Sequence, residues 1–162
     1  SGPTFATFDI VGEIAGYQNT NKFGFYQQGN AANKTQVFTG PDNTATPDKT
    51  FSVLNNFGLY LKANNATFWY SDRFLNNAPQ AGTPLNSGGD PQALIYKIGS
   101  QNQYLIAFED LDVTGVTDKD YNDFWVKMTV TPEPGSWALF ALGAVALLFL
   151  ARRKKALTGS FF

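Results

Sequence analysis

The sequence of 162 residues contains no cysteine and no histidine. Without cysteine the chain has no disulfide bond, thiol nucleophile, zinc-thiolate site or iron–sulfur site. Without histidine it has neither a Ser-His-Asp triad nor an imidazole metal ligand. Most common catalytic arrangements are therefore excluded. We expect a protein that is not an enzyme.

Charged residues are also scarce, at 15% of the chain, and the formal net charge is −1. They are unevenly distributed, because residues 1–131 hold 8 basic and 12 acidic residues, a net charge of −4, and four cations cluster near the end at Arg152, Arg153, Lys154 and Lys155. A mildly acidic main domain argues against nucleic-acid binding. The opening Ser1-Gly2-Pro3 lacks the features of a signal peptide, so we expect an exported chain that begins after a removed one.

Prolines and a glycine mark the sharpest boundary of the chain, in the predicted linker 132–136. Before it lies a predicted ectodomain, residues 1–131, and after it an apolar run, residues 137–151, and a basic tail, residues 152–162. As a helix the run spans about 22 Å, short of a hydrocarbon core of roughly 30 Å, although flanking Arg and Lys side chains can reach the interface. The run has no polar side chain and needs apolar surroundings. Lipid or neighbouring copies of the helix are favoured over the core of its own domain.

Aromatic and β-branched residues recur in short clusters between Asn, Gly, Pro and Asp along residues 1–131, which is typical of an all-β domain. The apolar residues Phe124, Val126 and Met128 alternate with Trp125, Lys127 and Thr129. This period of two is typical of a strand with one buried face. We predict an antiparallel β-sandwich that is jelly-roll-like, followed by one C-terminal apolar α-helix. The nine predicted strands are residues 5–11, 23–27, 35–38, 50–54, 57–62, 67–70, 93–98, 103–109 and 124–130.

Two aromatic segments resemble each other: Phe23-Gly24-Phe25-Tyr26 and Phe57-Gly58-Leu59-Tyr60. Pairing of two strands within one sandwich explains the similarity as well as an internal repeat does. Aromatic residues make up 15% of the chain. Most of them are expected in the core, and an exposed strip that stacks on sugar rings is the alternative.

Six of the 13 acidic residues lie in the predicted loop 109–123 between the last two strands. Oxygen donors at alternating positions of such a loop suit a hard cation, and the irregular spacing favours Ca²⁺ over Mg²⁺. An EF-hand is rejected, because Asp123 replaces the turn glycine and Thr129 replaces the bidentate glutamate. A solvated acidic loop and a glycosidase carboxylate pair are the alternatives. The predicted calcium ligands are Glu109, Asp110, Asp118, Asp120, Asn122 and Asp123.

The C-terminal segment resembles a PEP-CTERM sorting signal of Gram-negative bacteria. The resemblance rests on Pro132, Glu133 and Pro134, then the apolar run, then Arg152, Arg153, Lys154 and Lys155. It implies export to the cell surface or the extracellular space, processing by the membrane protease-transpeptidase exosortase, and an association with exopolysaccharide and biofilm. Residues 156–162 continue beyond the basic cluster, where members of that family usually end.

The segments 104–111 and 118–124 are similar to an uncharacterised β-domain family with a Phe-Glu-Asp-Leu signature followed by Asp-x-Asp-Tyr-Asn-Asp. That resemblance implies calcium binding and no enzymatic activity. We therefore expect a calcium-stabilised structural protein of the bacterial surface or extracellular matrix. Residues 137–151 would act as a transmembrane helix or would join copies of the chain, for example into a filament. A carbohydrate-binding module or a hydrolase of matrix polysaccharide is the alternative.

Overall fold

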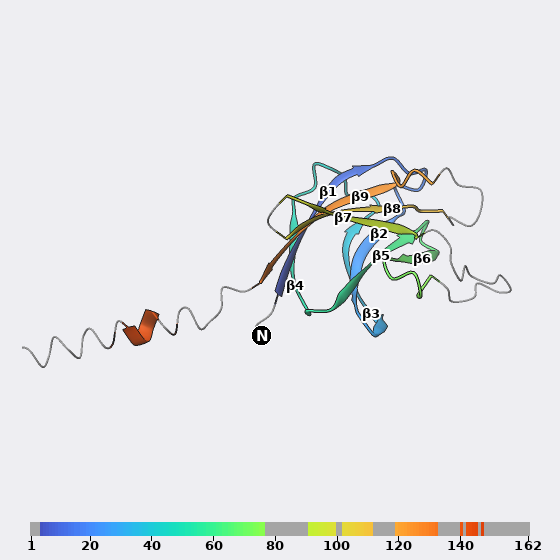
Figure 1. Cartoon of the computed structure of the whole chain (residues 1–162). Coiled ribbons are helices and arrows are strands. Elements are labelled where there is room, and N and C mark those ends of the chain that lie inside the picture. The colour runs from blue at the N-terminus through green and yellow to red at the C-terminus, as the bar shows by residue number, and fades with distance from the viewer. Residues whose placement is uncertain are drawn as a thin grey trace, which may run out of the picture. The chain divides into compact units, whose positions relative to one another are not determined.

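The computed structural model describes residues 4–76, 91–99, 102–111 and 119–132, together with 140, 142–145 and 147. The chain divides into a compact unit, Thr4–Thr131, and a second unit of Ser1–Pro3 with Pro132–Phe162. All nine predicted strands are confirmed within the first unit (Figure 1). They are β1 (Thr4–Glu13), β2 (Lys22–Gln27), β3 (Asn30–Thr39), β4 (Lys49–Val53), β5 (Phe57–Ala63), β6 (Thr67–Tyr70), β7 (Ala93–Ile98), β8 (Gln103–Phe108) and β9 (Phe124–Pro132).

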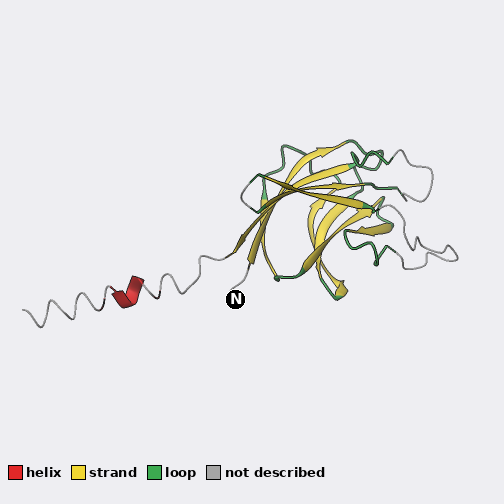
Figure 2. Cartoon of the chain, in the orientation of Figure 1, coloured by secondary structure: helices red, strands yellow, loops and turns green. Residues whose placement is uncertain are grey.

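The strands form two antiparallel sheets that face each other (Figure 2), so the predicted all-β sandwich is confirmed. The five-stranded sheet has the order β4-β1-β9-β8-β7, and the four-stranded sheet has the order β3-β2-β5-β6. Within the five-stranded sheet, β7, β8 and β9 follow one another as antiparallel neighbours. The finer jelly-roll-like topology stays a prediction.

Phe23 of β2 lies at the centre of the core and touches aromatic rings from the opposite sheet. Its ring centroid is 5.7 Å from that of Phe8, 6.2 Å from that of Phe108 and 5.5 Å from that of Phe124. Alternate residues of the strands fill this core, as the period-two pattern requires. The other core residues from the two sheets are Ala6, Ile10, Val37, Phe38, Val53, Leu59, Leu61, Ala93, Ile106, Val126 and Met128.

The two similar aromatic segments form neighbouring strands, as the pairing interpretation expects. In the ladder between β2 and β5, Gly24 lies opposite Tyr60 and Tyr26 lies opposite Gly58. Each tyrosine therefore faces the glycine of the other segment. These four residues point away from the core, because Phe23 and Leu61, their neighbours in sequence, point into it.

The predicted apolar helix is described only in part. Helical structure is described at Phe140, at 142–145 and at Leu147, and these side chains are exposed. Within the described residues, no helix is long and apolar enough to cross a membrane. The remainder of 137–151, like the tail 152–162, lies outside the described residues.

Candidate functional site

The acidic loop lies at the end of the five-stranded sheet where β1 and β8 end and β9 begins (Figure 1). Glu13 is the last residue of β1, Glu109 and Asp110 follow β8, and Asp123 precedes β9. We call these four residues the acidic end. The strand β9 leads from there to Pro132, about 30 Å away for nine residues of strand.

Asn21 connects two of these carboxylates. Its Nδ2 donates to Oδ2 of Asp110 at 3.1 Å and to Oε1 of Glu13 at 3.4 Å. Its Oδ1 accepts a hydrogen bond of 3.1 Å from the backbone N–H of Asn64. Asn21 is 1% exposed, so the amide is held in a buried position that fixes the distance between the two acids.

Asp123 connects β9 to the other two strands. Its Oδ2 accepts a hydrogen bond of 2.8 Å from the backbone N–H of Asp110, and its carbonyl accepts one of 3.2 Å from the N–H of Ile14. The carbonyl of Asp110 accepts a further bond of 2.9 Å from Nε1 of Trp69, on the four-stranded sheet. The acidic end is thus tied to both sheets.

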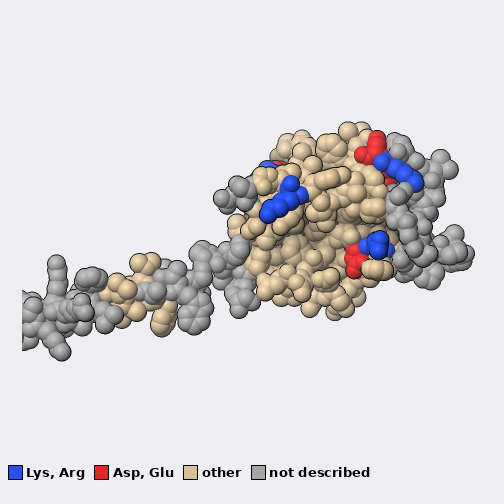
Figure 3. Space-filling view, in the orientation of Figure 1, with Lys and Arg blue, Asp and Glu red and all other residues tan. Residues whose placement is uncertain are grey.

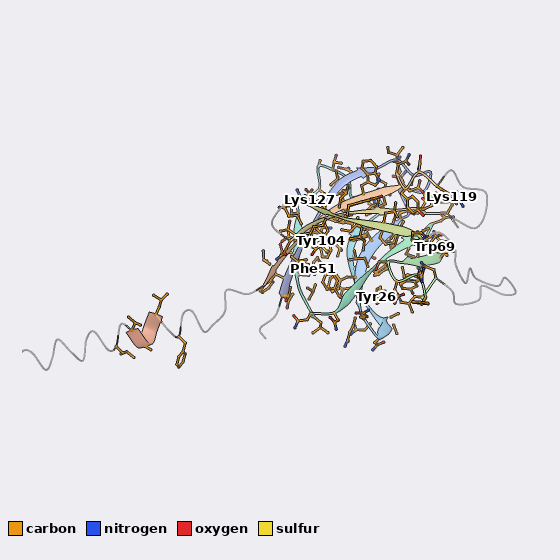
Figure 4. The ribbon with its side chains drawn as sticks, viewed as in Figure 1. Tyr26, Phe51, Trp69, Tyr104, Lys119 and Lys127 are labelled. Atoms are coloured by element: carbon orange, nitrogen blue, oxygen red, sulfur yellow. The ribbon has the colours of Figure 1, made fainter. Side chains whose placement is uncertain are left out.

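The second half of the loop folds back over Glu109, which is only 1% exposed. Oε2 of Glu109 accepts a hydrogen bond of 3.3 Å from the backbone N–H of Tyr121. Lys119 and Tyr121 have positive φ values of 54° and 53°, in the left-handed region that residues other than glycine seldom adopt. Asp120 and Asn122 bond to each other, with the backbone N–H of Asn122 3.2 Å from Oδ1 of Asp120. Figure 4 shows Lys119 at this end of the sandwich.

Burial and mutual repulsion make ionisation of two carboxyl groups unfavourable. Burial, together with the charges of Asp110 and Asp123, raises the pKa of Glu13 to about 7, although the hydrogen bond from Asn21 opposes the shift. Burial and the nearby Asp123 raise the pKa of Asp110 to about 6, again against the hydrogen bond from Asn21. The acidic end therefore concentrates negative charge that a proton or a cation would stabilise.

Two ion pairs lie away from the acidic end: Lys49 Nζ is 3.0 Å from Oδ2 of Asp42, and Lys127 Nζ is 2.7 Å from Oδ2 of Asp9. Figure 3 shows how few charged side chains the visible face of the domain carries. The donor set of the acidic end, carboxylates with an amide, is of the type that hard cations prefer.

The structure brings together some of the predicted calcium ligands. Asp123 accepts a hydrogen bond from the backbone of Asp110, and Glu109 accepts one from the backbone of Tyr121. Asp120 and Asn122 form a pair of their own, and Asp118 lies outside the described residues. Within the described residues, which omit 112–118, no group of three or more acidic side chains is close enough to hold a metal ion. Calcium binding therefore stays a prediction.

Sequence reasoning missed Glu13 and Asn21. Both lie about ninety residues from Asp110 in the sequence. Glu13 reaches it because β1 pairs with β9, and Asn21 reaches it from the start of β2 in the other sheet. The one local signal was Glu13 itself, an acid directly after a strand pattern. Of the predicted sorting signal, Pro132 ends β9, and the remaining residues lie outside the described part: Glu133, Pro134, Arg152, Arg153, Lys154 and Lys155.

Comparison with known families gives one match. Residues 130–155 match the PEP-CTERM protein-sorting motif, which confirms the resemblance of the C-terminal segment. The motif indicates an exported protein that exosortase processes. No curated protein and no solved structure matches the chain. The resemblance of segments 104–111 and 118–124 to a calcium-type β-domain is not confirmed.

Proposed function

We propose that this chain is a structural protein of the Gram-negative cell surface or extracellular matrix, whose β-sandwich is displayed outside the cell. The match to the sorting motif carries the proposal, because the motif indicates an exported protein that exosortase processes. The motif begins at residue 130, within β9, so in the sequence it follows the strands of the sandwich.

Residues 137–151 hold the protein in place, either as a tether in lipid or by packing against the same segment of other copies, as in a filament. Ala138, Ala141, Gly143 and Ala144 support the second mode, because small side chains allow helices to approach closely. Cross-linking of the exported protein in intact cells distinguishes these modes. A ladder of oligomers that disappears when Gly143 and Ala144 are replaced by leucine supports assembly, whereas monomers that fractionate with the membrane support a tether.

The domain works without catalysis in this proposal. With neither histidine nor cysteine, a hydrolase would depend on two carboxyl groups on opposite sides of a cleft. The carboxylates of the acidic end instead lie close together at the end of one sheet. Turnover of a polysaccharide panel that is lost on substitution of an acid outside 109–123 would contradict this assignment.

We further propose that Ca²⁺ stabilises the acidic end. Glu109, Asp110, Asp118, Asp120, Asn122 and Asp123 are its proposed ligands, with Glu13 and Asn21 beside them. Two features support the proposal. Burial and mutual repulsion raise the pKa values of Glu13 and Asp110, and hydrogen bonds through Asn21 and Asp123 hold the carboxylates at one end of the sheet. A divalent cation would link β1, β8 and β9 at that end.

A calcium titration tests this part of the proposal. Because a ligand that binds only the folded state stabilises it by mass action, Ca²⁺ at 100 times its Kd should raise the free energy of unfolding by about 2.7 kcal/mol. Asp120→Ala should reduce the calcium-induced rise in melting temperature and leave the core intact. Asp48→Ala, which removes an exposed acid remote from the acidic end, is the matched control. A melting temperature that chelator leaves unchanged would refute calcium stabilisation.

A further inference from the structure

Four aromatic rings lie on the outer side of the four-stranded sheet, where polar side chains are usual. The residues are Tyr26 of β2, Tyr60 of β5, and Phe68 and Tyr70 of β6. Cross-strand register places them on one face, since Tyr60 lies opposite Tyr70 and Tyr26 lies opposite Gly58. Their neighbours in sequence fill the core on the other side. Packing between the two sheets therefore does not account for these rings. We call the four rings, together with Lys22, Lys34 and Lys62, the aromatic face.

The rings form two levels. Tyr26 and Tyr60 are only 1% and 4% exposed, because each lies over a glycine of the neighbouring strand. Phe68 and Tyr70 are partly exposed and stand beside each other, with centroids 6.1 Å apart and planes 18° apart. Tyr70 meets Tyr26 edge to face at 5.4 Å, and Phe68 meets Tyr60 at 5.5 Å. The buried pair thus fixes the positions of the exposed pair.

Lysine side chains surround the exposed pair. Nζ of Lys34 is 4.6 Å from the centroid of Phe68 and 5.3 Å from that of Tyr70, and Nζ of Lys62 is 5.2 Å from that of Phe68. Lys22 lies opposite Lys62 on the same face. None of these three lysines is in an ion pair within the described residues, unlike Lys49 and Lys127. The aromatic face is therefore locally basic on a domain with a net charge of −4.

We propose that the aromatic face binds an acidic polysaccharide, that is, a polymer of pyranose rings of which only some carry a carboxylate. The C–H faces of pyranose rings pack on aromatic side chains, and the ammonium groups of the lysines offer partners for the carboxylates. The proposal goes beyond the structural role argued above. It requires display outside the cell and is independent of calcium.

Nucleic acid also combines rings that can stack with negative charge, so it is the competing ligand. The small number of lysines on the aromatic face favours a saccharide. Nucleic acid carries a phosphate at every nucleotide, and its binding depends on neutralising many of them. Three lysines on an acidic domain suit a sparsely charged polymer better, because the field of the whole domain repels a densely charged one.

Binding to hyaluronan oligosaccharides, in which every second sugar carries a carboxylate, tests the proposal. The full chain in mild detergent should bind hyaluronan more tightly than dextran, a neutral polymer, or oligo-dT. The double variant Phe68→Ala/Tyr70→Ala should weaken binding about tenfold. Lys34→Gln/Lys62→Gln should weaken it about fivefold and should also reduce its dependence on salt.

Variants on the other sheet supply matched controls. Tyr96 is 53% exposed on β7, and Lys97 next to it is also exposed. Tyr96→Ala and Lys97→Gln should change the affinity less than twofold. If replacement of Tyr70 unfolds the domain, the variant Lys34→Gln/Lys62→Gln still tests the proposal, because it leaves the aromatic rings in place. The proposal is wrong if the parent chain does not bind hyaluronan, if dextran or oligo-dT binds as tightly, or if the β7 variants lose as much affinity as those of the aromatic face.

Discussion

The ring of Tyr26 lies across the sheet from Gly58, so close that a Cβ atom on Gly58 would stand 2.6 Å from Cε1 of that ring. The relationship is reciprocal, because a Cβ atom on Gly24 would stand 2.8 Å from Cε1 of Tyr60. Real Cβ atoms do not approach other atoms so closely. The two glycines provide the space in which the tyrosines lie flat on the sheet, and the two tyrosines shield the glycine backbone from water.

Gly58→Ala should destabilise the domain by about 1–3 kcal/mol, because the added methyl group forces the Tyr26 ring from its position. Denaturant unfolding followed by tryptophan fluorescence measures this change. Gly16→Ala is the control, since nothing lies within 4 Å of a Cβ atom there, and it should change the free energy of unfolding by less than about 0.5 kcal/mol. Equal effects of the two substitutions would show that the close packing of Tyr26 and Gly58 has no energetic role.

Tyr26→Phe should leave stability unchanged or raise it by about 1 kcal/mol. The Tyr26 hydroxyl is buried beside Ser71, and its geometry completes no hydrogen bond within the described residues. Removal of an unsatisfied buried hydroxyl removes a desolvation cost. Tyr26→Ala should instead cost about 3–5 kcal/mol, because the ring itself is lost. A loss of more than 1 kcal/mol in the phenylalanine variant would mean that the hydroxyl has a hydrogen-bond partner.

The strands could be predicted from the sequence because the alternation of apolar and polar residues along each strand reflects which of its faces is buried. Alternation such as that of Phe124, Val126 and Met128 reports one buried face, whatever the neighbouring strand is. The order of strands is not encoded in this way, so the sequence did not predict the sheet orders β4-β1-β9-β8-β7 and β3-β2-β5-β6. The beginning of β3 at Asn30 was missed, since its polar residues extend a hairpin with β2 and do not enter the core.

Only those residues of the acidic end that lie close together in the sequence could be predicted. Glu109, Asp110 and Asp123 stand close together in the sequence, so their proximity in space follows from one loop between paired strands. Glu13 reaches the same place through pairing of β1 with β9, and Asn21 through packing of the two sheets, and no local pattern encodes either. The raised pKa values of Glu13 and Asp110 depend on these tertiary contacts, so they could not be predicted from the sequence either.

Stability without divalent cations should fall as the pH rises from about 4.5 to about 7. The pKa of Glu13 is raised from 4.5 to about 7 and that of Asp110 from 3.8 to about 6. Between these values the folded protein holds protons that the unfolded chain releases, so each increase in pH favours the unfolded state. The expected loss is about 1–3 kcal/mol, measured by urea unfolding in chelator.

Glu13→Gln should flatten this pH dependence, because it removes the carboxyl with the larger shift. Asp48→Asn, at an exposed acid elsewhere on the domain, should leave the dependence as it is. A free energy of unfolding that rises over the same pH range in the parent chain would show that Glu13 and Asp110 are ionised more easily when folded than when unfolded.

Deletion of residues 135–162 should leave a folded, soluble monomer with the melting temperature of the full chain. The last strand is complete without them: β9 ends at Pro132, and the backbone N–H of Val130 still bonds to the carbonyl of Asn102 at 3.0 Å. The compact unit Thr4–Thr131 also ends before the deletion. A chain that ends at Asp123 is the control. It lacks the central strand β9 and its buried side chains Phe124, Val126 and Met128, and should not fold. Circular dichroism and analytical ultracentrifugation measure both outcomes.

Unfolding or aggregation of the variant that lacks residues 135–162 would show that the apolar run belongs to the core of the domain. Removal of a core segment leaves a hydrophobic surface exposed, whereas removal of a separate segment does not.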